Sequence, residues 1–133
     1  ANAGMVAPLL VPCGGAPRFL DVGGVPIGTA LSGSYRELTI ALGEDDTLLL
    51  LSDGLVEAHN RAGALFGFER LEALLAALPP GTAVDELVQR ILDAVLAFAD
   101  GAEPHDDMTI IATRPAARAA LAAPAAPQTL AAR

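Results

Sequence analysis

The strongest constraint on the fold of this chain is an apolar run that ends abruptly in a polar turn. Residues 47–51 read Thr-Leu-Leu-Leu-Leu, and Ser52, Asp53 and Gly54 follow directly. A short apolar run bounded by turn residues predicts a strand, here over residues 47–52, that is buried on both faces. The charged side chain of Asp53 directly follows this buried strand, and a carboxylate at such a position needs an explanation.

Four further segments predict the rest of the β-structure. Residues 6–12 and 17–21 are short apolar runs separated by turn residues, and they predict a hairpin-like pair. The moderate alternation of apolar and polar residues over Tyr35–Leu42 predicts a half-buried strand. Residues 108–113, after a polar loop, predict the last strand.

Two segments instead have apolar residues at helical spacing. Residues 66–78 form the first, and Pro79-Pro80-Gly81 ends it. Residues 84–96 form the clearest amphipathic pattern in the chain, and Thr82 with Asp85 resembles a capping box at its start. The order of these elements predicts an α+β domain with largely antiparallel strands.

Composition excludes several functional classes. The net charge of −8 and the lack of a basic patch or an aromatic platform argue against a surface for nucleic acid or an anionic membrane. No apolar run approaches the roughly 20 residues of a membrane span. Cys13 is the single cysteine, which excludes an intrachain disulfide and favours a reducing compartment. We therefore expect a cytoplasmic protein.

The acidic residues at strand ends are the candidate functional residues. Asp53 follows one strand, and Asp106 and Asp107 immediately precede another, so these carboxylates could converge at one edge of the sheet. Mg²⁺ and Mn²⁺ prefer such oxygen ligands on a rigid frame. Gly54 lets the backbone turn without crowding a ligand, and Glu57 could face the same way as Asp53 if the segment is helical.

Ordinary structural interpretations remain open for each of these residues. Asp-Gly after a strand is common turn chemistry, and a pair of aspartates before a strand is common in loops. Glu57 alone is typical of a solvated helix face. The two histidines, His59 and His105, are more typical of loop residues than of metal ligands, although His105 adjoins Asp106.

A family resemblance favours the functional interpretation. Residues 48–71, LLLLSDGLVEAHNRAGALFGFERL, resemble the signature of the bacterial serine phosphatases related to stage II sporulation protein E. These enzymes belong to the metal-dependent, protein phosphatase 2C-like superfamily. The family's Asn-Ala-Gly start, its Gly-Gly-x-Pro loop and its closing Asp-Asp motif also have counterparts, at residues 2–5, 23–28 and 106–109.

The resemblance has implications for the fold and the domain organisation. It implies that residues 1–114 are the C-terminal half of an α-β-β-α sandwich with mainly antiparallel sheets. The family's other half and a sensory domain would then lie upstream of residue 1. Residues 115–133 are rich in alanine and proline and are expected to be a low-complexity tail. Met5 stands where the family has a histidine, and a thioether is a poor ligand for a hard cation.

The resemblance also implies a reaction. It makes Asp53 and Asp106 ligands of a two-metal Mn²⁺ or Mg²⁺ site, with Asp107 in a supporting or less direct role. The family hydrolyses phosphoserine and phosphothreonine through a metal-activated water, without a covalent intermediate. The implied substrate is a phosphorylated regulatory protein, such as an anti-sigma-factor antagonist.

Two other functions remain open from the sequence. The chain could be a truncated or degenerate phosphatase-like module that binds a regulatory partner without catalysis; Met5 and the absent upstream half favour this. It could also be an acidic cation-binding domain without phosphate chemistry, although that would need more clustered ligands than the sequence offers.

Overall fold

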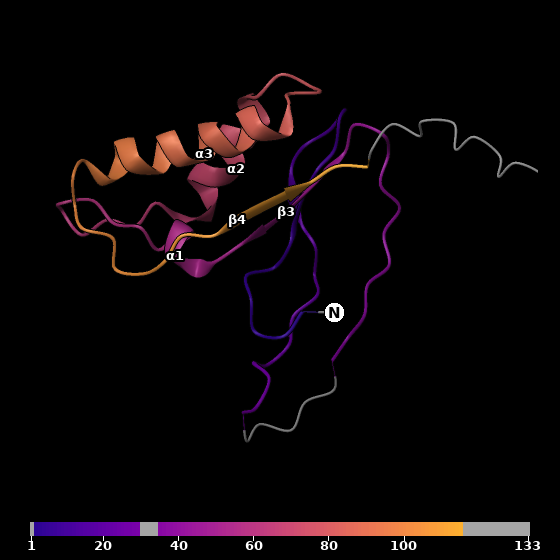
Figure 1. Ribbon diagram of the computed structural model, residues 1–133, viewed down its shortest axis with the longest axis horizontal. Helices are drawn as coiled ribbons and strands as arrows, with labels where there is room; N and C mark the ends of the chain where they lie inside the picture. The colour runs from indigo at the N-terminus through magenta and orange to yellow at the C-terminus, as the bar shows by residue number, and fades with distance from the viewer. Residues whose placement is uncertain (1, 30–34, 116–133) are drawn as a thin grey trace, which may run out of the picture.

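The computed structural model describes residues 2–29 and 35–115 of the chain (Figure 1). In these residues, three helices accompany a four-stranded antiparallel sheet with the strand order β2-β1-β3-β4. In chain order the elements are β1 (Leu9–Val11), β2 (Arg18–Phe19), β3 (Thr47–Leu51), α1 (Asp53–Val56), α2 (Gly67–Ala77), α3 (Val84–Ala99) and β4 (Ile110–Thr113). The predicted α+β class with antiparallel strands is confirmed. Within the described residues, no helix has the length and apolar composition needed to cross a membrane.

The two helical predictions and four of the five regions expected to hold strands are confirmed, with shorter bounds for the strands. Leu9 of β1 lies opposite Phe19 of β2, as expected for a hairpin-like pair. On its other side β1 pairs with β3, where Leu9 faces Leu49, and β3 pairs with β4, where Leu51 faces Ile110. Strand β3 is therefore central in the sheet, between two partners that lie far from it in the sequence.

The main core lies between the sheet and the helices. Alternate residues of β3, namely Leu49 and Leu51, are buried on the side that faces α2 and α3. Ile91 of α3 is fully buried there, because every third or fourth residue of an amphipathic helix lies on the same face. The other members of this cluster are Leu9, Leu55, Val56, Phe66, Leu71, Leu75, Leu87 and Val95. In Figure 1 both long helices lie on one side of the strands.

The opposite face of the sheet carries a smaller core. Leu10 packs there with Leu20 and Val22, and Leu48 of β3 adds a partly buried side chain. Irregular segments cover this face only in part, and Ile111 is 53% exposed. In Figure 1 the loops before β3 extend away from the helices. The described residues thus form one helical layer and one sheet of the expected sandwich.

The predicted strand over residues 35–42 is wrong, because this segment is irregular. Within the described part of the chain it makes no backbone–backbone hydrogen bond. The apolar residues of its alternating pattern still contribute to packing, since Ile40 and Leu42 contact the Leu10 cluster. Apolar alternation predicts a face that can be buried, but a strand also requires backbone hydrogen bonds to a neighbouring strand. The expected tail at 116–133 lies outside the described residues.

The predicted capping box at the start of α3 is also wrong. Ala83 is the N-cap, and it makes no side-chain hydrogen bond to the helix. The Thr82 hydroxyl instead donates to the Pro79 carbonyl oxygen at 2.7 Å. Thr82 therefore stabilises the turn between the helices.

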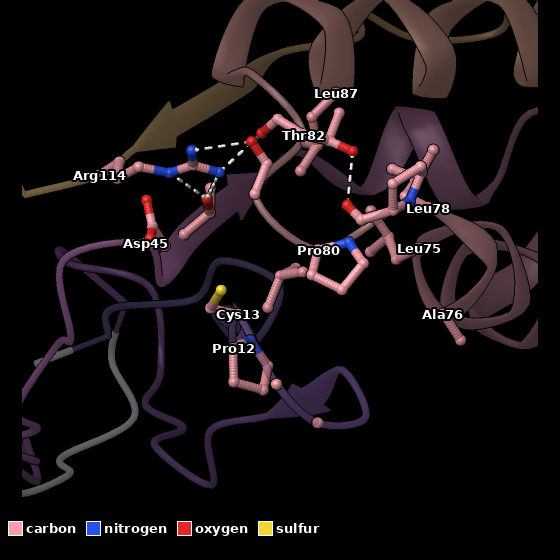
Figure 2. A pocket seen from close by; sticks show the side chains of 16 residues that line it. Pro12, Cys13, Asp45, Leu75, Ala76, Leu78, Pro80, Thr82, Leu87 and Arg114 are labelled. Carbon is pink, nitrogen blue, oxygen red and sulfur yellow. Dashed lines mark hydrogen bonds between the residues drawn. The ribbon is translucent and has the colours of Figure 1, made fainter.

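Arg114 ties the end of β4 to this interhelical turn (Figure 2). Its Nη2 donates to the Thr82 carbonyl oxygen at 2.7 Å. Its Nε and Nη2 also donate to the hydroxyl of Thr47, at 3.1 and 2.9 Å, and Thr47 is 1% exposed. The guanidinium thus joins β3, β4 and the turn beside a small cavity of about 180 Å³, which Cys13 also lines.

We expect Thr47→Val to destabilise the fold by about 1–2 kcal/mol, because it removes the acceptor of a charged hydrogen bond without changing the side chain's volume. Urea denaturation followed by circular dichroism measures this loss. Thr113→Val, an exposed position on neighbouring β4, is the matched control and should leave the midpoint almost unchanged. Equal midpoints for the two variants would contradict the assigned role of Thr47.

The turn before β3 depends on Asp46. Its carboxylate accepts the backbone N–H of Gly43 at 2.8 Å and that of Cys13 at 3.0 Å. The bond from Cys13, followed by that from Gly43, lowers the pKa of Asp46 below its ordinary value of 3.8. These bonds hold the loop after β1 against the start of β3.

This lowered pKa gives a pH-dependent prediction. A carboxyl group whose pKa is lower in the folded state stabilises the fold above its unfolded pKa, and the stabilisation is lost as the pH falls through the folded pKa. We expect Asp46→Asn to be less stable than the natural chain at neutral pH. The difference should shrink below pH 3.8. Urea midpoints of both proteins, measured from neutral pH to below pH 3.8, test this prediction. A difference in stability that does not depend on pH would contradict it.

Candidate functional site

The end of β3 places Asp53 at the surface. Ser52 precedes α1 in an extended conformation, and Asp53 is the first residue of this single helical turn. The Asp53 side chain is exposed, and its Oδ1 accepts the N–H of Gly54 at 3.0 Å. The backbone N–H of Glu57 closes the turn on the Asp53 carbonyl oxygen at 2.8 Å. The sequence predicts that Glu57 faces the same way as Asp53 only if this segment is helical, and the segment does form a helical turn.

Ser52 holds the start of β4 against the end of β3. Its hydroxyl donates to the Asp107 carbonyl oxygen at 2.9 Å and accepts the Thr109 N–H at 2.9 Å. The Ser52 N–H also donates to the Thr109 carbonyl oxygen at 3.0 Å. Three hydrogen bonds from one residue thus fix the Asp106-Asp107 segment beside α1.

Gly54 allows the closest part of this contact. It is buried, and a Cβ atom placed on it would lie 2.6 Å from the Asp107 carbonyl oxygen and 3.2 Å from the Asp106 Cβ. Only a residue without a side chain fits there. The sequence suggested that Gly54 leaves room for a ligand, whereas the structure gives it a packing role against the second acidic segment.

The two acidic segments, which the sequence separates by about fifty residues, therefore lie side by side at one end of the sheet. Asp106 and Asp107 are both exposed, and Asp106 Oδ1 accepts the Asp107 N–H at 2.7 Å. Glu57 and Asp106, one from each of these segments, line an open cavity of about 540 Å³. Asp53 lies one residue before Gly54, which lines the same cavity.

These residues have the type of ligand atom that a divalent ion prefers, but they are too few to hold one alone. Exposed aspartate oxygens are the ligands that Mg²⁺ and Mn²⁺ prefer. The described residues, however, contain no group of three or more His, Cys, Asp or Glu side chains placed to hold one ion. Asp53 and Asp106 could thus contribute to a metal site, but a complete set of ligands is not formed by the described part of the chain.

Two further motifs of the resemblance contact each other. Asn2 is buried, and its side chain bonds both the N–H and the carbonyl oxygen of Met5, each at 2.9 Å. Gly24 lies so close to the Asn2 carbonyl oxygen that any side chain would collide with it. Met5 is 56% exposed and lines an apolar hollow with Leu51. Asn2 therefore has a structural role, because its side chain closes the turn to Met5 while its backbone packs against Gly24.

The histidines are placed in a way that the sequence did not predict. His59 and His105 stack on each other with ring centroids 3.9 Å apart and an interplanar angle of 16°. Both line the cavity beside Glu57 and Asp106. Each histidine lies in a loop, as expected, but spacing cannot reveal a contact between residues so far apart. The only signal was that His105 adjoins Asp106.

Arg70 has a structural role. Its Nη1 donates to the carbonyl oxygens of Leu65 and Phe66, both at 2.9 Å, and its guanidinium lies 4.7 Å from the centroid of the Phe98 ring. These contacts fix the start of α2 against α3. Arg70 is therefore held by the protein and does not line the cavity beside Asp106.

Comparisons with known proteins identify the family and the fold. The sequence model of the family described as Stage II sporulation protein E (SpoIIE) matches residues 1–116. The fold is similar to the solved structure titled "SiaA-PP2C domain of Pseudomonas aeruginosa", with a TM-score of 0.69 and 19% sequence identity. The similarity covers 84% of this chain and 44% of that one, so this chain spans less than half of the compared domain. No curated protein matches the chain significantly.

Proposed function

Since this chain belongs to the family of stage II sporulation protein E and has the fold of part of a protein phosphatase 2C domain, we propose that it is part of a metal-dependent phosphoserine/phosphothreonine protein phosphatase. The observation that supports this most is the contact of Gly54 with Asp106 and Asp107. It brings together the two acidic motifs that the family shares.

In this proposal Asp53 and Asp106 contribute carboxylate ligands to a site for Mn²⁺ or Mg²⁺. Such ions, when bound, lower the pKa of a coordinated water so that it can attack phosphorus near neutral pH. Ser52 and Gly54 keep the two ligand-bearing segments in register, and Asp107 orients the loop through its backbone. Further ligands would come from the half of the domain that this chain does not span.

The proposed substrate and context follow from the family. A phosphorylated regulatory protein, such as an anti-sigma-factor antagonist, is the substrate class that we propose, with a sensory domain upstream and a cytoplasmic location. We assign residues 1–114 to the phosphatase-like domain and 115–133 to a tail. The family match over residues 1–116 supports this boundary.

A second candidate is a phosphatase-like module that binds a regulatory partner without catalysis. Two observations favour it. The described residues do not form a complete set of metal ligands, and an exposed methionine, Met5, occupies the position of the family's histidine. The two candidates differ in whether phosphate is released.

The experiment that separates them is release of inorganic phosphate from a phosphoserine peptide, measured with added Mn²⁺ and with EDTA. The phosphatase proposal expects release that requires Mn²⁺. Binding of the peptide without release would support the module without catalysis. Release that continues unchanged in EDTA would contradict the metal-dependent reaction.

A further inference from the structure

The cavity beside the two acidic segments has properties that the phosphatase proposal does not use. It has a volume of about 540 Å³ and is open to solvent. It lies between two segments that are distant in the sequence, one over residues 57–65 and the other at residues 105–106. Its lining residues are Gly54, Glu57, Ala58, His59, Gly63, Leu65, His105 and Asp106.

One wall of the cavity is a small hydrogen-bonded hairpin. His59 pairs with Leu65 across it, and the Phe66 N–H donates to the Ala58 carbonyl oxygen at 2.7 Å. The Asn60 side chain closes the tip by accepting the N–H groups of Ala62 and Ala64, both at 3.0 Å. These bonds give the wall a defined shape without any ligand.

The histidine stack joins this wall to the opposite one. His59 belongs to the hairpin and His105 to the loop before β4, and their rings lie parallel at 3.9 Å. Both histidines line the cavity, and each ring has one face that the stack leaves uncovered by the other ring. A planar cation can stack on such a surface.

The charge of the cavity is negative. Glu57 and Asp106 supply carboxylates, and no arginine lines it. Within the described residues the Glu57 side chain makes no ion pair and no hydrogen bond. With Asp106 assigned to the metal site, Glu57 is the carboxylate that remains for a ligand.

We propose that this cavity binds the guanidinium group of an arginine close to the phosphorylated residue of the substrate. The inference rests on the proposed function, because the adjoining Asp106 places the cavity next to the reaction. The guanidinium would stack on the histidine pair and form a charged hydrogen bond with Glu57. Leu65, whose side chain is 54% exposed, offers apolar contact to the methylene groups of the arginine.

The two histidines provide a direct measurement of binding. The chain contains no others, so the imidazole signals in a ¹H–¹³C NMR spectrum report on this cavity alone. The probes are two unphosphorylated peptides that differ only in an arginine or a citrulline, which has the same shape without the charge. We expect the arginine peptide to shift both histidine signals in a saturable way and the citrulline peptide to bind about fivefold more weakly.

A matched pair of variants tests the contact with Glu57. Glu57→Gln should weaken binding of the arginine peptide about fivefold. Glu44→Gln, which removes the same charge in the exposed turn at the far end of β3, should leave it unchanged. Equal binding of the two peptides, or equal effects of the two variants, would overturn the proposal.

This test needs neither metal nor phosphate release, so its failure is distinguishable from failure of the phosphatase proposal. Selective binding of the arginine peptide, with no phosphate release under any metal condition, would support arginine as the ligand of the cavity. It would contradict the claim that the cavity lies beside a catalytic site. Mn²⁺-dependent release without selective binding of arginine would support the phosphatase and overturn the assignment of the cavity.

Discussion

Asp53→Asn is expected to lower Mn²⁺-dependent phosphate release about 1000-fold, since the ligand of a catalytic ion is worth several kcal/mol in the transition state. Stability should change little. The side chain is exposed, and an asparagine oxygen can still accept the Gly54 N–H that Asp53 now accepts at 3.0 Å. Loss of the negative charge at the start of α1 costs at most about 1 kcal/mol. Initial rates and a urea denaturation curve for the same preparation measure both effects.

Asp45→Asn is the matched control for this substitution. Asp45 is exposed in the turn before β3, at the other end of the strand from Asp53, so its replacement should leave phosphate release unchanged. If Asp53→Asn retained the rate of the natural chain while remaining folded, Asp53 would not be a metal ligand.

Gly54→Ala is expected to destabilise the fold by about 1–3 kcal/mol. The added Cβ would lie 2.6 Å from the Asp107 carbonyl oxygen, and a backbone atom cannot move aside as the end of a flexible side chain can. The Asp106-Asp107 segment must therefore shift away from α1. That shift should also weaken the hydrogen bonds between Ser52 and this segment, which are now 2.9 Å long.

Gly14→Ala introduces the same methyl group at an open position, where nothing lies within 4 Å of the new Cβ. Urea midpoints should therefore fall for Gly54→Ala and hold for Gly14→Ala. The same midpoint for both variants would show that the contact between α1 and the second acidic segment is looser than its geometry indicates.

The sequence was sufficient for those elements that have a local apolar signal. Strand β3 was predicted because a short apolar run is bounded by turn residues. Helices α2 and α3 were predicted because apolar residues such as Leu71 and Ile91 recur at helical spacing. The irregular segment at 35–42 shows the limit of this reasoning. Its alternation correctly indicated that Ile40 and Leu42 pack against apolar side chains, but a strand also needs backbone pairing, which the alternation does not report.

The candidate site was predictable only in part for the same reason. Family motifs identified Asp53 and the Asp106-Asp107 pair, but no local pattern shows that Ser52 bonds to Thr109 or that Gly54 packs on Asp107. These contacts depend on β3 and β4 being neighbours in the sheet. Thr82 illustrates the converse case. The local pattern indicated a cap at Thr82, but the N-cap is Ala83, and the Thr82 hydroxyl bonds to the preceding turn.

The most direct test of the account is to locate bound Mn²⁺ by NMR. Mn²⁺ is paramagnetic and broadens the backbone amide signals nearest to it. We predict the strongest broadening around residues 52–57 and 104–109, and its loss in Asp53→Asn. Broadening centred instead on the acidic turn at residues 43–46, or spread evenly over the acidic surface, would contradict a metal site at the end of β3.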